Sequence, residues 1–261
     1  MIVAVIAMLA AAEPAEIHPD QAQFNSCIAL IRTDAQRAAD LAGEWRLRGG
    51  GLYARQCLGL AFVTLERWQP AAVAFEQAAQ EAQTRKDPRA ADLWAQSGNA
   101  WLAMNDGPKA RTAFDAALAS TSLPEQLRGG VHFDRARANV ILTDLAGART
   151  DIDKGLELVP ADPFGWYLSA ALAMREQALP RARTDIARAM ELAPDDADVL
   201  LLAGNIAGES GELAAAQTFY TRAVSAAPGS AAGKAAQAAL AANSGPPESA
   251  APMQAAPQRA P

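Results

Sequence analysis

The sequence predicts an all-α fold made of repeated helical units. The first observation is a fixed period: three similar stretches follow one another, and equivalent residues recur every 34 positions. These equivalent residues are Ala148, Ala182 and Ala216, together with Pro160, Pro194 and Pro228. A period of this length is typical of a repeat array, whose units bury their apolar faces only by stacking. The second observation is the composition, which is 51% hydrophobic but only 6% aromatic, and rich in alanine, the strongest helix former.

The first expected element is a signal peptide at residues 1–12. This run is apolar and too short to cross a bilayer of roughly 30 Å as a helix. The small residues Ala10 and Ala12 suit cleavage before Glu13, although no Lys or Arg precedes the run. We therefore expect an exported, periplasmic protein whose mature chain does not insert stably into a membrane. The alternative is a buried first helix.

Residues 20–48 are expected to form a divergent first hairpin. The turn RTD joins its two helices, and three consecutive glycines, Gly49 to Gly51, follow the second helix. We interpret these glycines as a helix C-terminus and a sharp turn. The alternative is an anion-binding nest of glycine amides beside Arg46 and Arg48.

Five repeat units of two helices each are expected next. In each unit, small residues stand where the two helices approach each other, and large residues fill the gaps between them. Aspartates before Phe164 and Val199 are typical of helix N-caps. The third unit departs from the pattern, because the long connection STSLPEQLRGG precedes it and Asn139 replaces an apolar residue. The five units span about residues 52–85, 91–122, 129–161, 163–195 and 197–229.

The last two elements follow the repeats. Residues 231–243 predict an alanine-rich helix that covers the exposed face of the last repeat and keeps the array soluble. Residues 244–261 mix proline, alanine, glycine and serine with almost nothing to bury, so we expect a disordered tail.

The positions of small, aromatic and proline residues in each unit resemble the tetratricopeptide repeat (TPR). Gly98 and Phe114 in the second unit, and Gly204 and Tyr220 in the fifth, match the small and aromatic positions of that pattern. The resemblance covers residue 52 to about residue 242 and implies a right-handed α-solenoid. It also implies a concave groove, lined by the first helix of each repeat, that holds a peptide or helix of a partner protein.

Inward-facing positions of TPR first helices predict the residues of this groove. They are Asn99, Phe133, Arg137, Phe164, Tyr167, Arg175, Leu201 and Asn205. An apolar, aromatic floor with Arg137 and Arg175 at its sides suits a mostly apolar partner segment that carries an acidic residue. The alternative is that the aromatic residues pack between neighbouring repeats.

The two cysteines, Cys27 and Cys57, lie in the first helices of two consecutive hairpins if residues 20–48 form a divergent repeat. Neighbouring first helices pack side by side in such an array, so a disulfide is geometrically feasible. An even count and an oxidising compartment favour it. The alternative is two separately buried thiols.

Enzymatic chemistry is not expected. The chain has only two histidines, His18 and His132, which argues against a zinc site or a catalytic triad. The stretch GSAAGKA at residues 229–235 lacks the spacing of a phosphate loop, and helix capping explains the aspartates within residues 195–198 better than calcium does. No catalytic, metal-binding or cofactor-binding residue is therefore predicted. A net charge of −6 also argues against a nucleic-acid partner.

These expectations describe a non-enzymatic interaction module or assembly scaffold of the bacterial envelope. Its expected partner is a protein or peptide, and the sequence does not identify which one. The alternative is a structural protein whose array edges self-associate without a peptide in the groove.

Overall fold

A computed structural model describes residues 19–121 and 123–243, and every regular element in these ranges is an α-helix. The all-α prediction is therefore confirmed. The expected signal peptide and C-terminal tail lie outside the described residues. The chain divides into two compact units, which we describe separately: unit 1 extends to Asp144, and unit 2 begins at Leu145.

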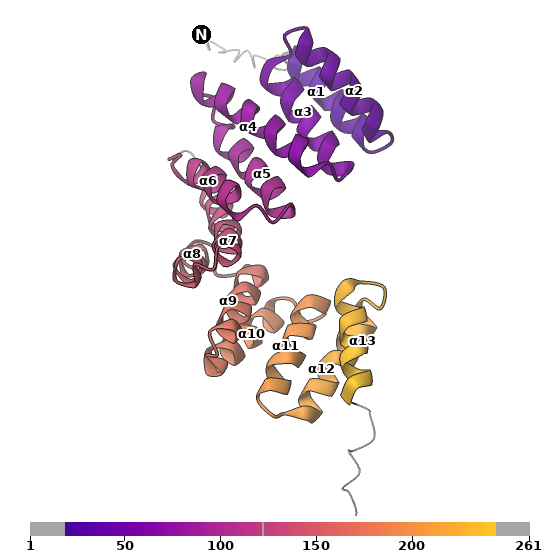
Figure 1. The fold of residues 1–261 in the computed structure, drawn as a ribbon, viewed down its shortest axis with the longest axis vertical. Coiled ribbons are helices and arrows are strands. Elements are labelled where there is room, and N and C mark those ends of the chain that lie inside the picture. The colour runs from indigo at the N-terminus through magenta and orange to yellow at the C-terminus, as the bar shows by residue number, and fades with distance from the viewer. Residues whose placement is uncertain (1–18, 122, 244–261) are drawn as a thin grey trace, which may run out of the picture. The chain divides into compact units, whose positions relative to one another are not determined.

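The described part of unit 1 consists of seven helices joined by short turns (Figure 1). Each helix packs against the next, and first helices of successive hairpins also lie side by side, α1 against α3 and α5 against α7. The helices are α1 (Pro19–Ile31), α2 (Ala35–Leu47), α3 (Gly51–Thr64), α4 (Trp68–Thr84), α5 (Ala90–Ala103), α6 (Gly107–Leu118) and α7 (Glu125–Ile141).

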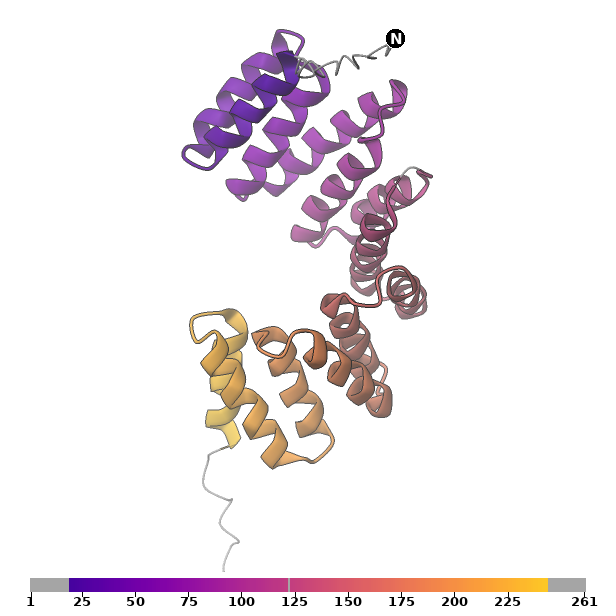
Figure 2. The same cartoon turned by 180° about the vertical axis from the view of Figure 1, so that it is seen from behind.

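Unit 2 contains six helices within its described residues. In this unit α9 lies beside α11, and α11 lies beside α13, the helix that was expected to cap the array. Figure 2 shows α13, in yellow, at the end of unit 2. The helices are α8 (Leu145–Leu158), α9 (Pro163–Arg175), α10 (Leu179–Leu192), α11 (Ala197–Glu209), α12 (Leu213–Ala226) and α13 (Ala231–Asn243).

Glycine in the first helix of a hairpin lets an aromatic ring of the second helix approach closely. A Cβ atom built on Gly98 in α5 would lie 2.5 Å from the ring of Phe114 in α6. The same construction on Gly204 in α11 meets the ring of Tyr220 in α12 at 2.4 Å. No real Cβ atom fits at such a distance, so the small and aromatic positions of the repeat are a matched pair.

The turn inside each repeat hairpin contains one residue in the left-handed region. The following amide then donates to the carbonyl five residues earlier in the chain, for example Asp106 N to Trp101 O at 3.0 Å. This bond closes the C-terminus of the first helix. The left-handed residues are Glu66 (φ 55°), Asn105 (φ 58°), Thr143 (φ 61°), Gln177 (φ 58°) and Gly211 (φ 76°).

Aspartates begin several helices, as the sequence predicted. The Asp162 carboxylate accepts a hydrogen bond from Phe164 N at 2.9 Å at the start of α9. The Asp196 carboxylate accepts from Val199 N at 3.0 Å at the start of α11. A side-chain acceptor at this position satisfies amides that have no partner within the helix.

The connection before α7 is shorter than the sequence suggested. Helix α7 begins at Glu125, so the last six residues of STSLPEQLRGG are helical. Arg128 explains the earlier start, because its guanidinium donates to the carbonyls of Ser120 (2.7 Å) and Leu118 (3.2 Å) and holds the remaining loop against the helix. This packing outweighs the low helix propensity of the two glycines.

The first two of the three consecutive glycines form the turn after α2, and Gly51 is the first residue of α3. Gly49 N donates to Arg46 O at 3.3 Å, and Gly50 N donates to Trp45 O at 3.0 Å. Gly50 also lies against the Trp45 ring, where a Cβ atom would come within 2.4 Å. These two amides are therefore already bonded to the end of α2, which favours the interpretation as a helix C-terminus over an anion nest.

A polar network joins α8, α9 and α10 inside unit 2. The buried Ser169 hydroxyl donates to Asp185 Oδ2 at 2.5 Å and accepts from Arg149 Nη1 at 2.7 Å. Arg181 donates to the same Asp185 oxygen at 3.3 Å and to Asp153 Oδ1 at 2.8 Å. Each carboxylate therefore has a cationic partner, which offsets the loss of hydration on burial.

Candidate functional site

The eight residues predicted to line a groove are divided between the two units. Unit 1 contains Asn99 on α5, with Phe133 and Arg137 on α7; unit 2 contains the other five. The three on α9 are Phe164, Tyr167 and Arg175, and the two on α11 are Leu201 and Asn205. The candidate sites are therefore described unit by unit.

In unit 1, two of the three predicted residues, Asn99 and Arg137, lie in a polar cluster with Asp134. Phe133 is only 1% exposed, so it belongs to the core. This burial agrees with the alternative that the aromatic residues pack between neighbouring repeats and do not line a groove. Arg137 is exposed, but it donates to Asp134 Oδ1 at 2.9 Å. Burial raises the pKa of Asp134, and hydrogen bonds from Asn99 and Arg137 oppose this shift. Arg137 is thus already paired within the protein.

A second carboxylate in unit 1 was not among the residues predicted from the sequence. Asp92, on α5, is partly buried, and Gln96 Nε2 donates to its Oδ2 at 2.5 Å. Burial raises the pKa of Asp92, and the Gln96 hydrogen bond opposes this shift. The i and i+4 spacing of the two residues on one helix face was the signal that could have revealed the contact.

Unit 1 also contains an arginine held between a carboxylate and an aromatic ring. Arg89 Nη2 donates to Asp87 Oδ2 at 2.6 Å, and the Arg89 guanidinium lies 4.2 Å from the centroid of the Tyr53 ring. This arrangement combines a charge-assisted hydrogen bond with a cation–π contact. It shows how an aromatic residue on α3 and an aspartate just before α5 together bind a guanidinium.

In unit 2 the predicted aromatic residues form an accessible pair. The rings of Phe164 and Tyr167 stack with centroids 6.3 Å apart and planes at 15°. Phe164 is 41% exposed, and Tyr167 and Leu201 are partly buried. We call this surface, made by Phe164, Tyr167 and Leu201, the first-helix face of unit 2.

The two remaining predicted residues of unit 2 differ in role. The Tyr220 hydroxyl donates to Asn205 Oδ1 at 3.0 Å, so Asn205 ties α11 to α12. Arg175 is exposed at the end of α9, and its side chain forms no ion pair with any described residue. Arg175 is therefore accessible to a partner, whereas Asn205 stabilises the α11–α12 hairpin.

Carboxylates at the start of α11 lie near the first-helix face. Burial, followed by the negative charges of Asp198 and Asp196, raises the pKa of Tyr167. The negative charge at the start of α11 therefore acts on the Tyr167 hydroxyl.

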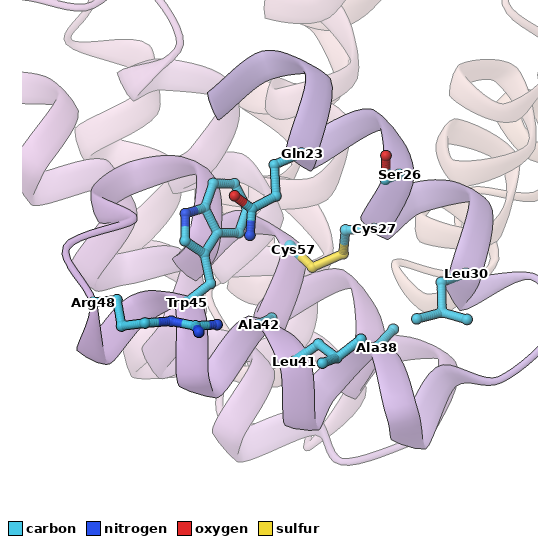
Figure 3. A pocket seen from close by; sticks show the side chains of 10 residues that line it. All are labelled: Gln23, Ser26, Cys27, Leu30, Ala38, Leu41, Ala42, Trp45, Arg48 and Cys57. Carbon is cyan, nitrogen blue, oxygen red and sulfur yellow. A yellow bond between two sulfur atoms is a disulfide. The ribbon is translucent and has the colours of Figure 1, made fainter. Parts of the chain in front are cut away.

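The disulfide predicted from the sequence is present in unit 1. Cys27 on α1 and Cys57 on α3 are bonded, with their Cα atoms 6.2 Å apart. The disulfide forms part of the wall of an apolar cavity of about 170 Å³ between α1 and α2 (Figure 3). No sequence pattern indicated this cavity, whose lining residues are Gln23, Ser26, Cys27, Leu30, Ala38, Leu41, Ala42, Trp45, Arg48 and Cys57.

Metal-binding and membrane-spanning features are both absent from the described ranges. In residues 19–121 and 123–243, no three His, Cys, Asp or Glu side chains are grouped in a way that could hold a metal ion. Over the same ranges, none of the helices has the length and apolar character that crossing a membrane requires.

Comparison with known proteins identifies the fold. No model of a known protein family matches the chain, and no curated protein sequence matches it. Among solved structures, PilW, a type IV pilus biogenesis factor, is similar with a TM-score of 0.70 and 18% identity over 85% of this chain and 98% of PilW. Pseudomonas aeruginosa PilF is similar with a TM-score of 0.66 and 19% identity, over 84% and 97% of the two chains. A thermophilic TPR protein of Thermus thermophilus, TTC0263, has a TM-score of 0.59 and 16% identity, over 74% and 98%.

The protein has the TPR fold. In TPR numbering, Phe164 and Tyr167 stand at positions 2 and 5 of a first helix, and Arg175 stands at position 13. These are the positions from which the sequence analysis predicted a groove. The accessible Phe164–Tyr167 pair places exposed aromatic surface on a first helix of this TPR array.

Proposed function

We propose that the protein is a non-enzymatic interaction scaffold of the bacterial envelope that binds a segment of a partner protein on the first-helix face of unit 2. The observation that carries this proposal is the Phe164–Tyr167 stack on α9, in which Phe164 is 41% exposed and Tyr167 is partly buried. Aromatic side chains are enriched among the residues that dominate binding energy at protein interfaces. Arg175 adds an exposed cation on the same helix.

Three observations support the envelope location. The apolar run at residues 1–12 has the character of a signal peptide. The Cys27–Cys57 disulfide suits an oxidising compartment. PilW, which this chain is similar to in fold, is described as a type IV pilus biogenesis factor. Mass analysis of the native protein should find a chain that begins near Glu13, and an intact Met1 would contradict export.

A double variant tests the binding face. Tyr167→Ala with Arg175→Glu should abolish crosslinking to the partner in envelope extract, because it removes the ring and reverses the exposed charge. Leu213→Ala is the matched control, since Leu213 is 62% exposed at the start of α12. Helical circular dichroism and the melting temperature should stay near the parent values in both. Collapse of the fold in the double variant would show that Tyr167 is a core residue.

A second candidate function is self-association of the array edge at α1 and α2. The apolar cavity beside the disulfide favours it, because Leu41 in its lining is 42% exposed and Leu47, further along α2, is 78% exposed. An accessible apolar surface of this kind is typical of an interaction site. Light scattering distinguishes the two functions: a dimer that Leu41→Glu converts to a monomer would support self-association, and a monomeric parent protein would exclude it.

A further inference from the structure

We propose that unit 1 carries a separate interaction surface, a pocket between α2 and α4 that binds a partner segment with a carboxylate next to an apolar side chain. The inference goes beyond the proposed function, because it concerns another unit and none of the residues predicted to line the groove. Helix α3 packs against both α2 and α4 and contributes to the pocket, whose volume is about 410 Å³. The lining residues are Arg46, Arg55, Leu58, Phe62, Gln69, Pro70, Val73, Ala74 and Gln77.

Arg55 occupies a position that packing alone would give to an apolar residue. It lies four residues before Gly59 in α3, and a Cβ atom on Gly59 would meet the ring of Phe75 at 2.6 Å, as in other hairpins. In α11 the residue four positions before the equivalent Gly204 is Leu200, which is 1% exposed. A hairpin of this type therefore folds with leucine at that position, so the fold does not require the cation.

The pairing of Arg55 is incomplete. Its Nη1 donates to Glu81 Oε2 at 2.5 Å, but its Nε is buried and has no hydrogen-bond partner among the described residues. The other Glu81 oxygen, Oε1, pairs with Arg85 Nη2 at 2.7 Å. Two guanidinium groups therefore share one carboxylate, and positive charge is left over. Because 27% of the Arg55 side chain is exposed, a partner can reach it through the pocket.

Arg46 adds a second positive charge at the pocket. It is exposed on α2, and its side chain forms no ion pair or hydrogen bond with any described residue. Of the described residues that line the pocket, only Arg46 and Arg55 are charged. A cleft lined by charges of one sign attracts ligands of the opposite sign. The pocket therefore favours an anionic group over a cationic one.

The equivalent pocket of unit 2, beside α11, is smaller, and its charge is already paired. It has a volume of about 170 Å³, and Phe219, the seventh residue of α12, stands where unit 1 has Ala74, the seventh residue of α4. The cation among its lining residues, Arg183, pairs with Glu212 at 2.7 Å. The larger volume and the surplus charge are therefore features of the unit 1 pocket and not general consequences of the repeat.

The apolar part of the pocket sets a second requirement for the partner. Leu58 and Phe62 are partly buried on α3, and Val73 on α4 is 38% exposed. Binding sites typically combine such apolar side chains with a few polar groups that fix the orientation of the ligand. A segment in which glutamate or aspartate adjoins an apolar residue meets both requirements, because the carboxylate reaches the arginines and the apolar group contacts these side chains.

Two synthetic peptides test this inference with the purified full chain. Both contain about twelve residues of leucine, proline and serine, with a fluorescein label and an amidated C-terminus; one carries a single glutamate next to a leucine, and the other carries glutamine there. Fluorescence anisotropy should show the glutamate peptide binding about tenfold more tightly at about 50 mM salt, with a smaller difference at about 500 mM salt. Equal binding of the two peptides, or no binding of either, would overturn the proposal.

Matched variants locate the site. Arg55→Leu copies Leu200 of α11, and it leaves Glu81 paired with Arg85. Arg46→Met copies Met190, since these two residues are the twelfth of α2 and of α10. Both variants should melt near the parent temperature and reduce the preference for glutamate to less than about threefold. Arg37→Met makes the same charge change at an exposed residue of α2 outside the pocket, so it should keep the preference.

The first-helix face of unit 2 has to be distinguished from this pocket, because Arg175 is also an exposed cation. The double variant Tyr167→Ala with Arg175→Glu should keep the preference for glutamate. If Arg46→Met and Arg55→Leu keep the preference, the proposal fails, and its loss in the double variant would then place the peptide on the first-helix face. If Arg37→Met also loses the preference, overall charge attracts the peptide and the proposal fails as well.

Discussion

Gly98 lies so close to Phe114 that one additional methyl group would occupy the space of the ring. Gly98→Ala is expected to lower the free energy of unfolding by roughly 1–3 kcal/mol, because α5 and α6 would have to separate to admit the new atom. Gly130→Ala is the matched control in the same unit: nothing lies within 4 Å of a Cβ atom there, and the residue is inside α7.

The control should change stability in the opposite direction. Alanine in a helix interior is more favourable than glycine by roughly 0.5–1 kcal/mol, so Gly130→Ala should stabilise the protein by about that amount. Urea unfolding of both variants measures the difference. If both substitutions stabilise, close packing is not the reason for glycine at position 98.

The raised pKa of Asp92 predicts that a neutral residue at this position makes the protein more stable, by an amount that depends on pH. Burial raises its pKa in the folded state above the value in the unfolded chain, so its charge opposes folding above the raised pKa. As the pH falls through that pKa, the folded state takes up the proton first and this penalty disappears. Asp92→Asn keeps a carbonyl that can accept from Gln96 Nε2 and removes the charge.

We therefore expect Asp92→Asn to melt at a higher temperature than the parent at pH 7. The difference should shrink near about pH 4, where the parent carboxyl becomes protonated. Thermal denaturation at the two pH values tests this, and a variant less stable than the parent at pH 7 would show that the Asp92 charge has a favourable partner.

Among the elements, α1 depends most directly on a covalent bond. The disulfide attaches it to α3 across a sequence separation of 30 residues. Cys27→Ser with Cys57→Ser should lower the free energy of unfolding by roughly 3–4 kcal/mol, since the unfolded chain gains the freedom of an open loop of this length. Urea unfolding of the parent in a reducing agent should reproduce the variant. If the reducing agent leaves the free energy of unfolding unchanged, the disulfide does not restrict the conformational freedom of the unfolded chain.

Sequence reasoning predicted elements better than it predicted the site. The pairing of Gly98 with Phe114 and the caps at Asp162 and Asp196 follow from local residue types, so the helices were predictable. Phe133 and Tyr167 occupy the same position of the repeat, yet one is buried and the other remains accessible. That difference depends on the neighbouring helices of each unit, which a pattern within one repeat does not contain.

The structure also revised the expected electrostatics. Arg137 looked like a free cation beside the groove, but it pairs with Asp134, only three residues away on the same helix. The capping role expected of Asp196 is confirmed, and the negative charges of Asp198 and Asp196 also raise the pKa of Tyr167.

At the scale of the whole molecule, contacts between neighbouring hairpins determine how far a local loss of stability extends along the chain. Each hairpin in a repeat array packs mainly against the next, so a perturbation at one end decays along the chain. Reduction of Cys27–Cys57 should therefore increase amide hydrogen exchange most in α1 and α2 and progressively less towards α6. Exchange in unit 2 should remain unchanged. Mass-spectrometric exchange measurements test this gradient, and a uniform increase across both units would indicate one globally cooperative structure.

The hairpin turns also contain positions at which a substitution should raise the melting temperature. Of the five left-handed residues, one is glycine, and Thr143 is β-branched, the side-chain type that tolerates this conformation least. Left-handed backbone penalises such residues by about 1–2 kcal/mol, more than the entropy that glycine adds to the unfolded chain. Glycine at positions 66, 143 and 177 should raise the melting temperature. Because these turns belong to different hairpins, the increments should add, so heat tolerance could increase without altering either proposed binding surface.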